Sequence, residues 1–125
     1  MSNRQQPRLF RDKKCHVINR LSSVGDISYR QRPLDFLFLL ARYKFAARLV
    51  KGNDRVLDAG CGDGIGSVFL GKFAKQVTGV DYDEELIENN KKEYKDIPNI
   101  DFKKLNLLNV SSHKATYDAV VSMDV

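Results

Sequence analysis

The spacing of apolar residues along this chain changes near Gly52. Before that point, apolar side chains recur every three or four residues, which is typical of one helical face. Pro33 suits the first turn of this helix, because the N–H that proline lacks is unpaired there anyway, and Gly52 ends the element. The predicted inward face consists of Phe36, Leu39, Leu40, Tyr43, Ala47 and Val50.

Four further apolar residues widen this surface beyond one stripe: Leu37, Phe38, Phe45 and Leu49. A helix that packs on one neighbour normally carries polar side chains on its other face. We therefore expect this helix to pack on a sheet and on something else.

After Gly52, short apolar runs alternate with helical patterns. The runs predict strands at residues 55–59, 76–80, 100–104 and 117–122. One helix is predicted over 64–73, with a buried face formed by Ile65, Val68, Phe69 and Phe73. A second begins after Asp83, a good N-cap, and its inward side is formed by Leu86, Ile87, Asn90 and Tyr94. Strands that alternate with helices favour an α/β fold with a doubly wound parallel sheet.

Residues 1–32 are polar and read as a basic N-terminal extension, with one short helix near Cys15–Leu21 and a turn over Ser22–Asp26. The net charge is +5, yet residues 1–55 hold 13 basic and 4 acidic side chains, while 56–125 hold 8 and 12. Such asymmetry can mark a nucleic-acid-binding arm. Because the basic residues are scattered and few aromatic residues lie among them, we favour a solvated extension and keep nucleic-acid binding as the minority alternative.

Composition limits the class of protein. With 125 residues, 42% hydrophobic and 30% charged, the chain fits one soluble globular domain, here 33–125. No apolar run approaches the roughly 20 residues of a membrane span, and no apolar secretory segment follows Met1, so we expect a cytoplasmic protein. Cys15 and Cys61 form neither a disulfide framework nor a metal-binding pair, so no metal site is predicted.

Candidate chemistry lies in the turn after the first predicted strand, Asp58-Ala59-Gly60-Cys61-Gly62-Asp63-Gly64. Glycines let the backbone approach a ligand at the carboxyl end of a strand. The dinucleotide spacing G-x-G-x-x-G is not met from any of these three glycines. Asp58 and Asp63 would repel a pyrophosphate but suit a cationic ligand without phosphate, such as S-adenosylmethionine.

A second acidic position has matching spacing. Asp81 ends the second predicted strand about 20 residues after Gly60, the separation at which a carboxylate reaches a ribose. The next residue, Tyr82, could lie against an adenine ring. A helix-flanking acid is the structural alternative for Asp81, but its combination with Asp58 and the glycine turn favours ligand binding.

The segment from Val56 to Gly64 resembles motif I of the class I, seven-stranded S-adenosylmethionine-dependent methyltransferases, and the resemblance extends over roughly residues 33–125. It implies a Rossmann-like sheet with strands in the order 3-2-1-4. It also implies that Asp58 and the turn containing Gly60, Cys61, Gly62 and Gly64 hold the methionine end of the cofactor.

The same resemblance implies that Asp81 binds the ribose. Asn106, in preference to Asn109, falls where many members carry an Asp for the adenine amino group, and an amide oxygen can still accept that hydrogen bond. Tyr43, or its neighbour Arg42, could meet the methionine carboxylate, although a packing tyrosine and a solvated arginine explain these residues equally well.

The sequence thus predicts an S-adenosylmethionine-dependent methyltransferase with a small-molecule acceptor that it does not identify. No catalytic base is predicted. We expect the chain to be a fragment or a truncated form of the fold, with the fourth strand as an open apolar edge and with no methyl transfer of its own. The alternative is a truncated, non-catalytic module that binds the cofactor or a partner.

Overall fold

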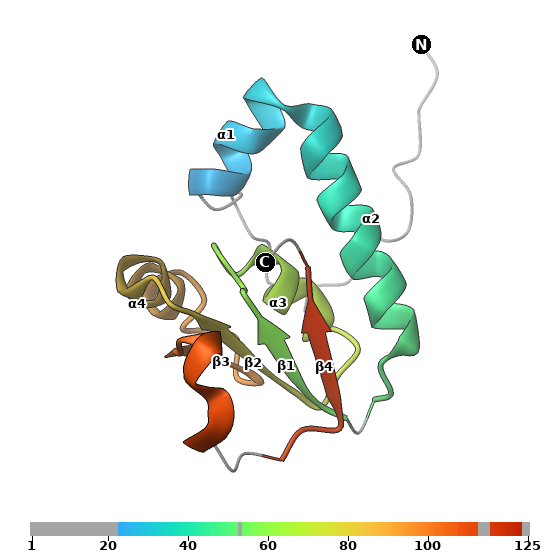
Figure 1. Cartoon of the computed structure of the whole chain (residues 1–125). Coiled ribbons are helices and arrows are strands. Elements are labelled where there is room, and N and C mark those ends of the chain that lie inside the picture. Colours follow the sequence, from blue (N-terminus) through green and yellow to red (C-terminus); the bar gives the residue numbers. More distant parts are fainter. Residues whose placement is uncertain (1–22, 53, 113–115, 124–125) are drawn as a thin grey trace.

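The computed structural model describes residues 23–52, 54–112 and 116–123. Its centre is a four-stranded parallel sheet in the order β3-β2-β1-β4 (Figure 1). The strands are β1 (Arg55–Ala59), β2 (Gln76–Asp81), β3 (Ile100–Lys104) and β4 (Ala119–Ser122). The predicted α/β fold, with a parallel sheet in the strand order 3-2-1-4, is confirmed.

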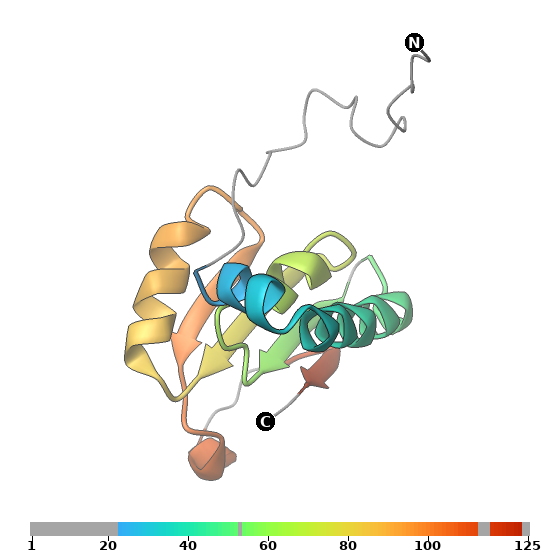
Figure 2. The same ribbon diagram turned by 90° about the horizontal axis from the view of Figure 1, so that it is seen from above.

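Within the residues that the structure describes, four α-helices and one 3-10 helix connect or precede these strands. They are α1 (Ser23–Gln31), α2 (Pro33–Leu49), α3 (Ile65–Leu70), α4 (Glu84–Glu93) and η2 (Leu107–Ser112). Helix α2 lies beside α3, and α4 lies next to β2 and β3 (Figures 1 and 2). No helix in the described part of the chain is long and apolar enough to cross a membrane.

One face of the sheet carries the core. The strand registers place Val56, Val77 and Ile100 in one row of this face, and Asp58, Gly79 and Phe102 in the next. One cluster packs side chains of α2 and α3 on β1, β2 and β4, and a second packs α3 and α4 on Phe102. Leu57 and Val120 pair on the opposite face, where Val120 is 64% exposed. The helices that form the core therefore all cover one side of the sheet.

Helix α2 follows its predicted pattern on the inner face. Proline occupies the first turn, as predicted, and Phe36, Tyr43 and Ala47 are buried, together with Ala46, which was not predicted to be. The four additional apolar residues of α2 are exposed.

The predicted turn over Ser22–Asp26 is wrong within the described residues, because α1 begins at Ser23. The predicted helix near Cys15–Leu21 lies outside the described residues. Serine and glycine favour turns locally, but α1 packs against α2, with the Tyr29 ring edge-on to Phe36 at a centroid distance of 6.3 Å. Tertiary contact thus overrides the local turn preference.

Helix α3 is shorter than predicted, ending at Leu70, and Phe73 is 47% exposed instead of buried. Gly71 is a poor helix former, and its carbonyl accepts a hydrogen bond from Asn99 Nδ2 at 2.8 Å instead of from a further helical turn. Strand β4 likewise begins two residues later than predicted, at Ala119.

Candidate functional site

The turn after β1 adopts a backbone that favours glycine. Gly60, Gly62 and Gly64 have φ angles of 78°, 53° and 79°. The amides of Gly60 and Cys61 both donate to the Val80 carbonyl, at 2.8 and 2.9 Å, which ties the turn to β2. A Cβ at Gly64 would lie 2.8 Å from the Tyr94 ring, whereas one at Gly62 would meet nothing within 4 Å. Gly64 is therefore fixed by packing, while Gly62 faces open space.

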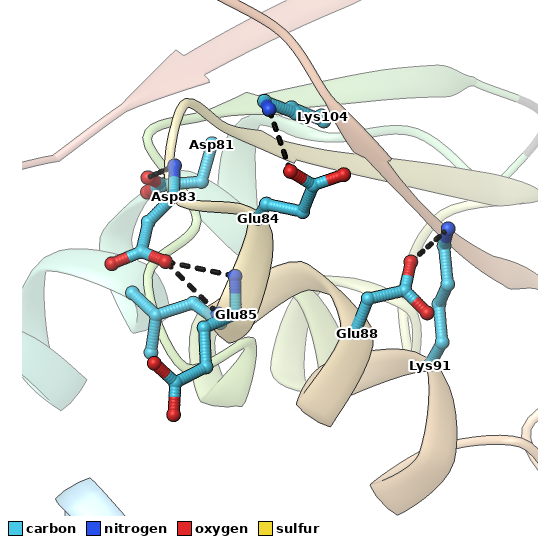
Figure 3. A network of polar contacts seen from close by, with 8 residues as sticks. Asp81, Asp83, Glu84, Glu85, Glu88, Lys91 and Lys104 are labelled. Atoms are coloured by element: carbon cyan, nitrogen blue, oxygen red, sulfur yellow. Dashed lines mark hydrogen bonds and ion pairs between the residues drawn. The ribbon is translucent and has the colours of Figure 1, made fainter.

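Asp81, at the end of β2, bridges this turn to the start of α4. Its Oδ2 accepts from the Gly62 amide at 3.1 Å, and its Oδ1 accepts from the Asp83 amide at 3.0 Å. Asp83 caps α4, as predicted, by accepting from the amides of Glu85 and Leu86 (Figure 3). Each Asp81 oxygen still has a lone pair for a ligand hydroxyl, because a carboxylate offers about four acceptor sites.

A second contact holds the neighbouring segment in place. Lys104 at the end of β3 forms an ion pair with Glu84 in the first turn of α4, at 2.8 Å (Figure 3). This exposed contact joins the end of β3 to the start of α4.

A pocket of about 570 Å³ opens where these segments meet. Gly60, Gly62 and Asp81 form its polar side. The rest is formed by Tyr82, Leu105, Asn106, Leu107 and Leu108. The Asn106 side-chain oxygen accepts from the Leu108 amide at 3.0 Å, which orients the amide group, and Tyr82 is 76% exposed at the rim. The pocket thus has an acidic end and an apolar end.

Asp58 lies beneath the glycine turn with a fully buried carboxylate. Ser67 Oγ donates to its Oδ2 at 2.6 Å, and the Tyr43 hydroxyl lies 3.1 and 3.3 Å from its two oxygens. Burial raises the pKa of Asp58 to about 6, although the hydrogen bonds from Ser67 and Tyr43 act in the opposite direction. Tyr43 reaches this carboxylate across Gly66, where a Cβ would lie 1.9 Å from the tyrosine ring.

Cys61 is unsuited to nucleophilic chemistry. Its thiol is buried, and its pKa is raised first by burial and then by the negative charges of Asp58 and Asp81. Among the described residues, no group of three or more His, Cys, Asp or Glu side chains could hold a metal ion.

The structure divides the predicted site residues into two groups. Five line the pocket: Gly60, Gly62, Asp81, Tyr82 and Asn106. The other four are buried next to or beneath the turn: Tyr43, Asp58, Cys61 and Gly64. Arg42, the alternative to Tyr43, is exposed on α2.

Sequence reasoning assigned no role to two buried polar residues that support the turn. Ser67 bonds Asp58, and Asn90 donates to the Gly62 carbonyl at 2.7 Å. Both are polar residues at inward positions of otherwise apolar helical faces, and this pattern could have identified them. The leucines at 105, 107 and 108 were also missed as pocket residues.

Comparison with known proteins shows which family shares this sequence and fold. A family model described as a methyltransferase domain matches residues 56–125. A protein from Mycolicibacterium smegmatis named a probable S-adenosylmethionine-dependent methyltransferase is 35% identical over 83 residues, which cover 66% of this chain and 31% of that protein. The ubiquinone biosynthesis O-methyltransferase of Methylocella silvestris is 34% identical over 87 residues, covering 69% of this chain and 34% of the relative.

Among solved structures, a dimethyladenosine transferase from Plasmodium falciparum superposes with a TM-score of 0.59 and 27% identity, over 69% of this chain and 31% of that one. The chain spans about a third of the length of the curated relatives it matches.

Proposed function

The chain belongs to the class I S-adenosylmethionine-dependent methyltransferases, whose cofactor is S-adenosylmethionine, and from this premise we propose that the protein transfers the sulfonium methyl group to a small-molecule acceptor. The observation that carries the proposal is the pocket in which Gly60, Gly62, Asp81 and Asn106 meet. Its acidic end suits the ribose hydroxyls, and its apolar end suits a purine ring.

We propose that Asp81 binds the two ribose hydroxyls of the cofactor. Its carboxylate is held from both sides by the amides of Gly62 and Asp83, so its orientation is set before a ligand arrives. Charge-assisted hydrogen bonds of this kind contribute roughly 1.5–3 kcal/mol each.

The adenine is proposed to lie between Tyr82 and the leucines that follow β3. Leu105, Leu107 and Leu108 line this end of the pocket, and the Asn106 amide lies among them. Since Asn106 Oδ1 already accepts from Leu108, one lone pair remains to accept from the adenine amino group.

The methionine end is assigned to the backbone of the turn at Gly60 and Gly62. Asp58 would act from below, because its carboxylate is fully buried and already accepts from Tyr43 and Ser67. We propose that it fixes the turn and places negative charge beneath the ammonium and sulfonium groups. Tyr43 then serves as a positioning residue for Asp58.

When bound, S-adenosylmethionine would supply a methyl group that is activated for transfer by its sulfonium centre. The protein's contribution is alignment and a suitable electrostatic environment. A small acceptor is supported by the relative named for ubiquinone biosynthesis. The likeness to a dimethyladenosine transferase keeps nucleic acid as the second candidate acceptor.

Calorimetric titration with S-adenosylhomocysteine tests the cofactor assignment. We expect a micromolar Kd, no binding of NAD, and an increase in Kd of roughly tenfold or more in Asp81→Ala, because hydrogen bonds to the ribose are lost. Asp96→Ala, an exposed acid after α4, is the matched control and should bind as the parent does. Thermal melting checks that each variant is folded.

Tight NAD binding, or unchanged affinity in a folded Asp81→Ala variant, would contradict the assignment. Binding of S-adenosylhomocysteine without methyl transfer to any small or nucleic-acid acceptor would favour the non-catalytic module instead.

A further inference from the structure

Helix α2 has apolar side chains on two opposite faces. Its inner face packs on the sheet through buried residues that include Phe36, Tyr43 and Ala47. Its outer face carries five large apolar side chains, each between 61% and 68% exposed: Leu34, Leu37, Phe38, Phe45 and Leu49. Helices that pack on one side only are normally polar on the other, so this outer face calls for a partner.

The exposed residues form a continuous stripe. Leu34, Phe38, Ala41 and Phe45 follow one another at spacings of four, three and four residues, which places them in one row along the helix, and all four are exposed. This row lies opposite the buried residues, and α2 forms the outer flank of the fold beside β4 (Figure 1).

Basic side chains flank the stripe. Lys44 and Arg48 lie one helical turn apart beside the stripe, Lys51 follows two residues after the end of α2, and all three are exposed. Asp35 is the one acid of α2, and Arg32 is ion-paired with it. The outer face of α2 therefore combines apolar bulk with positive charge.

The C-terminal end of the stripe, at Phe45, borders an apolar groove beside β4. That groove, of about 450 Å³, is lined by Phe45 and Leu49 of α2 and by residues 119–123. Leu34, Leu37 and Phe38 do not line it. They are exposed on the N-terminal half of α2, away from this groove.

We propose that the outer face of α2 binds the surface of an anionic phospholipid bilayer. Leu34, Leu37 and Phe38 enter the boundary between headgroups and acyl chains, while Lys44 and Arg48 contact lipid phosphates. Interfacial helices combine leucine and phenylalanine with lysine and arginine in this way, and an anionic leaflet attracts cationic side chains near its surface. The surface lies apart from the cofactor pocket, so the proposal does not depend on the proposed function.

The chain contains no tryptophan, which allows a direct test. Phe38→Trp places one reporter on the stripe, and Phe73→Trp places a control at another exposed phenylalanine, outside α2. Vesicles of phosphatidylcholine with phosphatidylserine should shift the emission of Phe38→Trp to shorter wavelength and leave Phe73→Trp unchanged. Vesicles of phosphatidylcholine alone should shift neither. Equal shifts in both variants, or no shift in either, would overturn the proposal.

Vesicle co-sedimentation tests the apolar residues and the basic residues of this surface separately. Leu34→Ser/Phe38→Ser and Lys44→Glu/Arg48→Glu should each weaken binding to phosphatidylserine vesicles at least tenfold. Phe73→Ser and Lys92→Glu/Lys95→Glu are controls matched in chemistry and charge, and both should bind as the parent does. If the α2 variants bind like their controls, or if size-exclusion chromatography shows that the stripe mediates self-association instead, the lipid assignment is wrong.

Discussion

The two sides of the central strand β1 differ in how completely contacts within the chain cover them. Toward β2, the glycine turn is held by contacts within the chain: Asp81 accepts from Gly62, Asn90 donates to the Gly62 carbonyl, and Tyr94 donates to the Asp63 carbonyl. Toward β4, exposed apolar side chains such as Val120 and Leu49 border a groove. The chain thus builds a rigid binding edge itself and presents apolar surface elsewhere for further contacts.

The strongest test of the rigid side is Gly66→Ala. A Cβ there would lie 1.9 Å from the Tyr43 ring, so Tyr43 must move and Asp58 loses a donor while remaining buried. Overpacking and the lost hydrogen bond together predict a loss of about 3 kcal/mol or more in the free energy of unfolding. Gly62→Ala is the control: its φ of +53° costs about 1–2 kcal/mol, but the added methyl meets nothing. Chemical denaturation measures both, and equal losses would contradict this account.

The buried carboxylate itself predicts a pH dependence. Because the pKa of Asp58 is raised from 3.8 to about 6, the folded state holds this proton more tightly than the unfolded state does, although the carboxylate is mostly ionised near pH 7. Its contribution to stability is therefore complete below pH 3.8 and is lost as the pH rises to about 6, by about 3 kcal/mol. Asp58→Asn should remove this part of the pH profile, whereas the exposed-acid control Asp96→Asn should retain it. Denaturation curves between pH 4 and 7 that keep the same slope in Asp58→Asn would show that Asp58 titrates normally.

Substitution of an exposed apolar residue on the β4 side should have the smallest effect on the free energy of unfolding. Val120 is 64% exposed on β4, so Val120→Thr keeps the branched shape and should change the free energy of unfolding by about 0.5 kcal/mol or less. Val121, the next residue, is 8% exposed and packs in the core, so Val121→Thr should cost roughly 1–3 kcal/mol. Thermal or chemical melting compares the two. Similar losses would mean that both faces of β4 are packed.

Most of the fold could be predicted from local patterns. The strands β1 to β3 and the helices α2 and α4 combine strong periodicity with clear ends, such as Pro33 and Asp83. Helix α1 could not be predicted, because its Ser and Gly residues favour a turn and its helix is supported by contact with α2. The end of α3 depends on Asn99, which is distant in sequence and reaches the Gly71 carbonyl.

The candidate site shows the same division. Gly60, Gly62 and Asp81 could be brought together from strand-end positions alone, because parallel strands end at one edge of the sheet. That Asp58 is enclosed by Tyr43 and Ser67 could not be read from the sequence, since the three residues come from β1, α2 and α3. The spacing of residues in the sequence predicts which of them lie at the same edge of the sheet. It does not predict which side chains from other elements cover them.

The strand order also has a kinetic consequence. Arg55 exchanges hydrogen bonds with Asp118, 63 residues away, whereas its partner on the other side is Gln76. Closing the longer loop costs about 1 kcal/mol more in chain entropy than closing the shorter one. The β1-β2-β3 unit can therefore assemble through its two helical crossovers while β4 is still free. Contacts distant in sequence form slowly, so we expect docking of β4 to be the last step of folding.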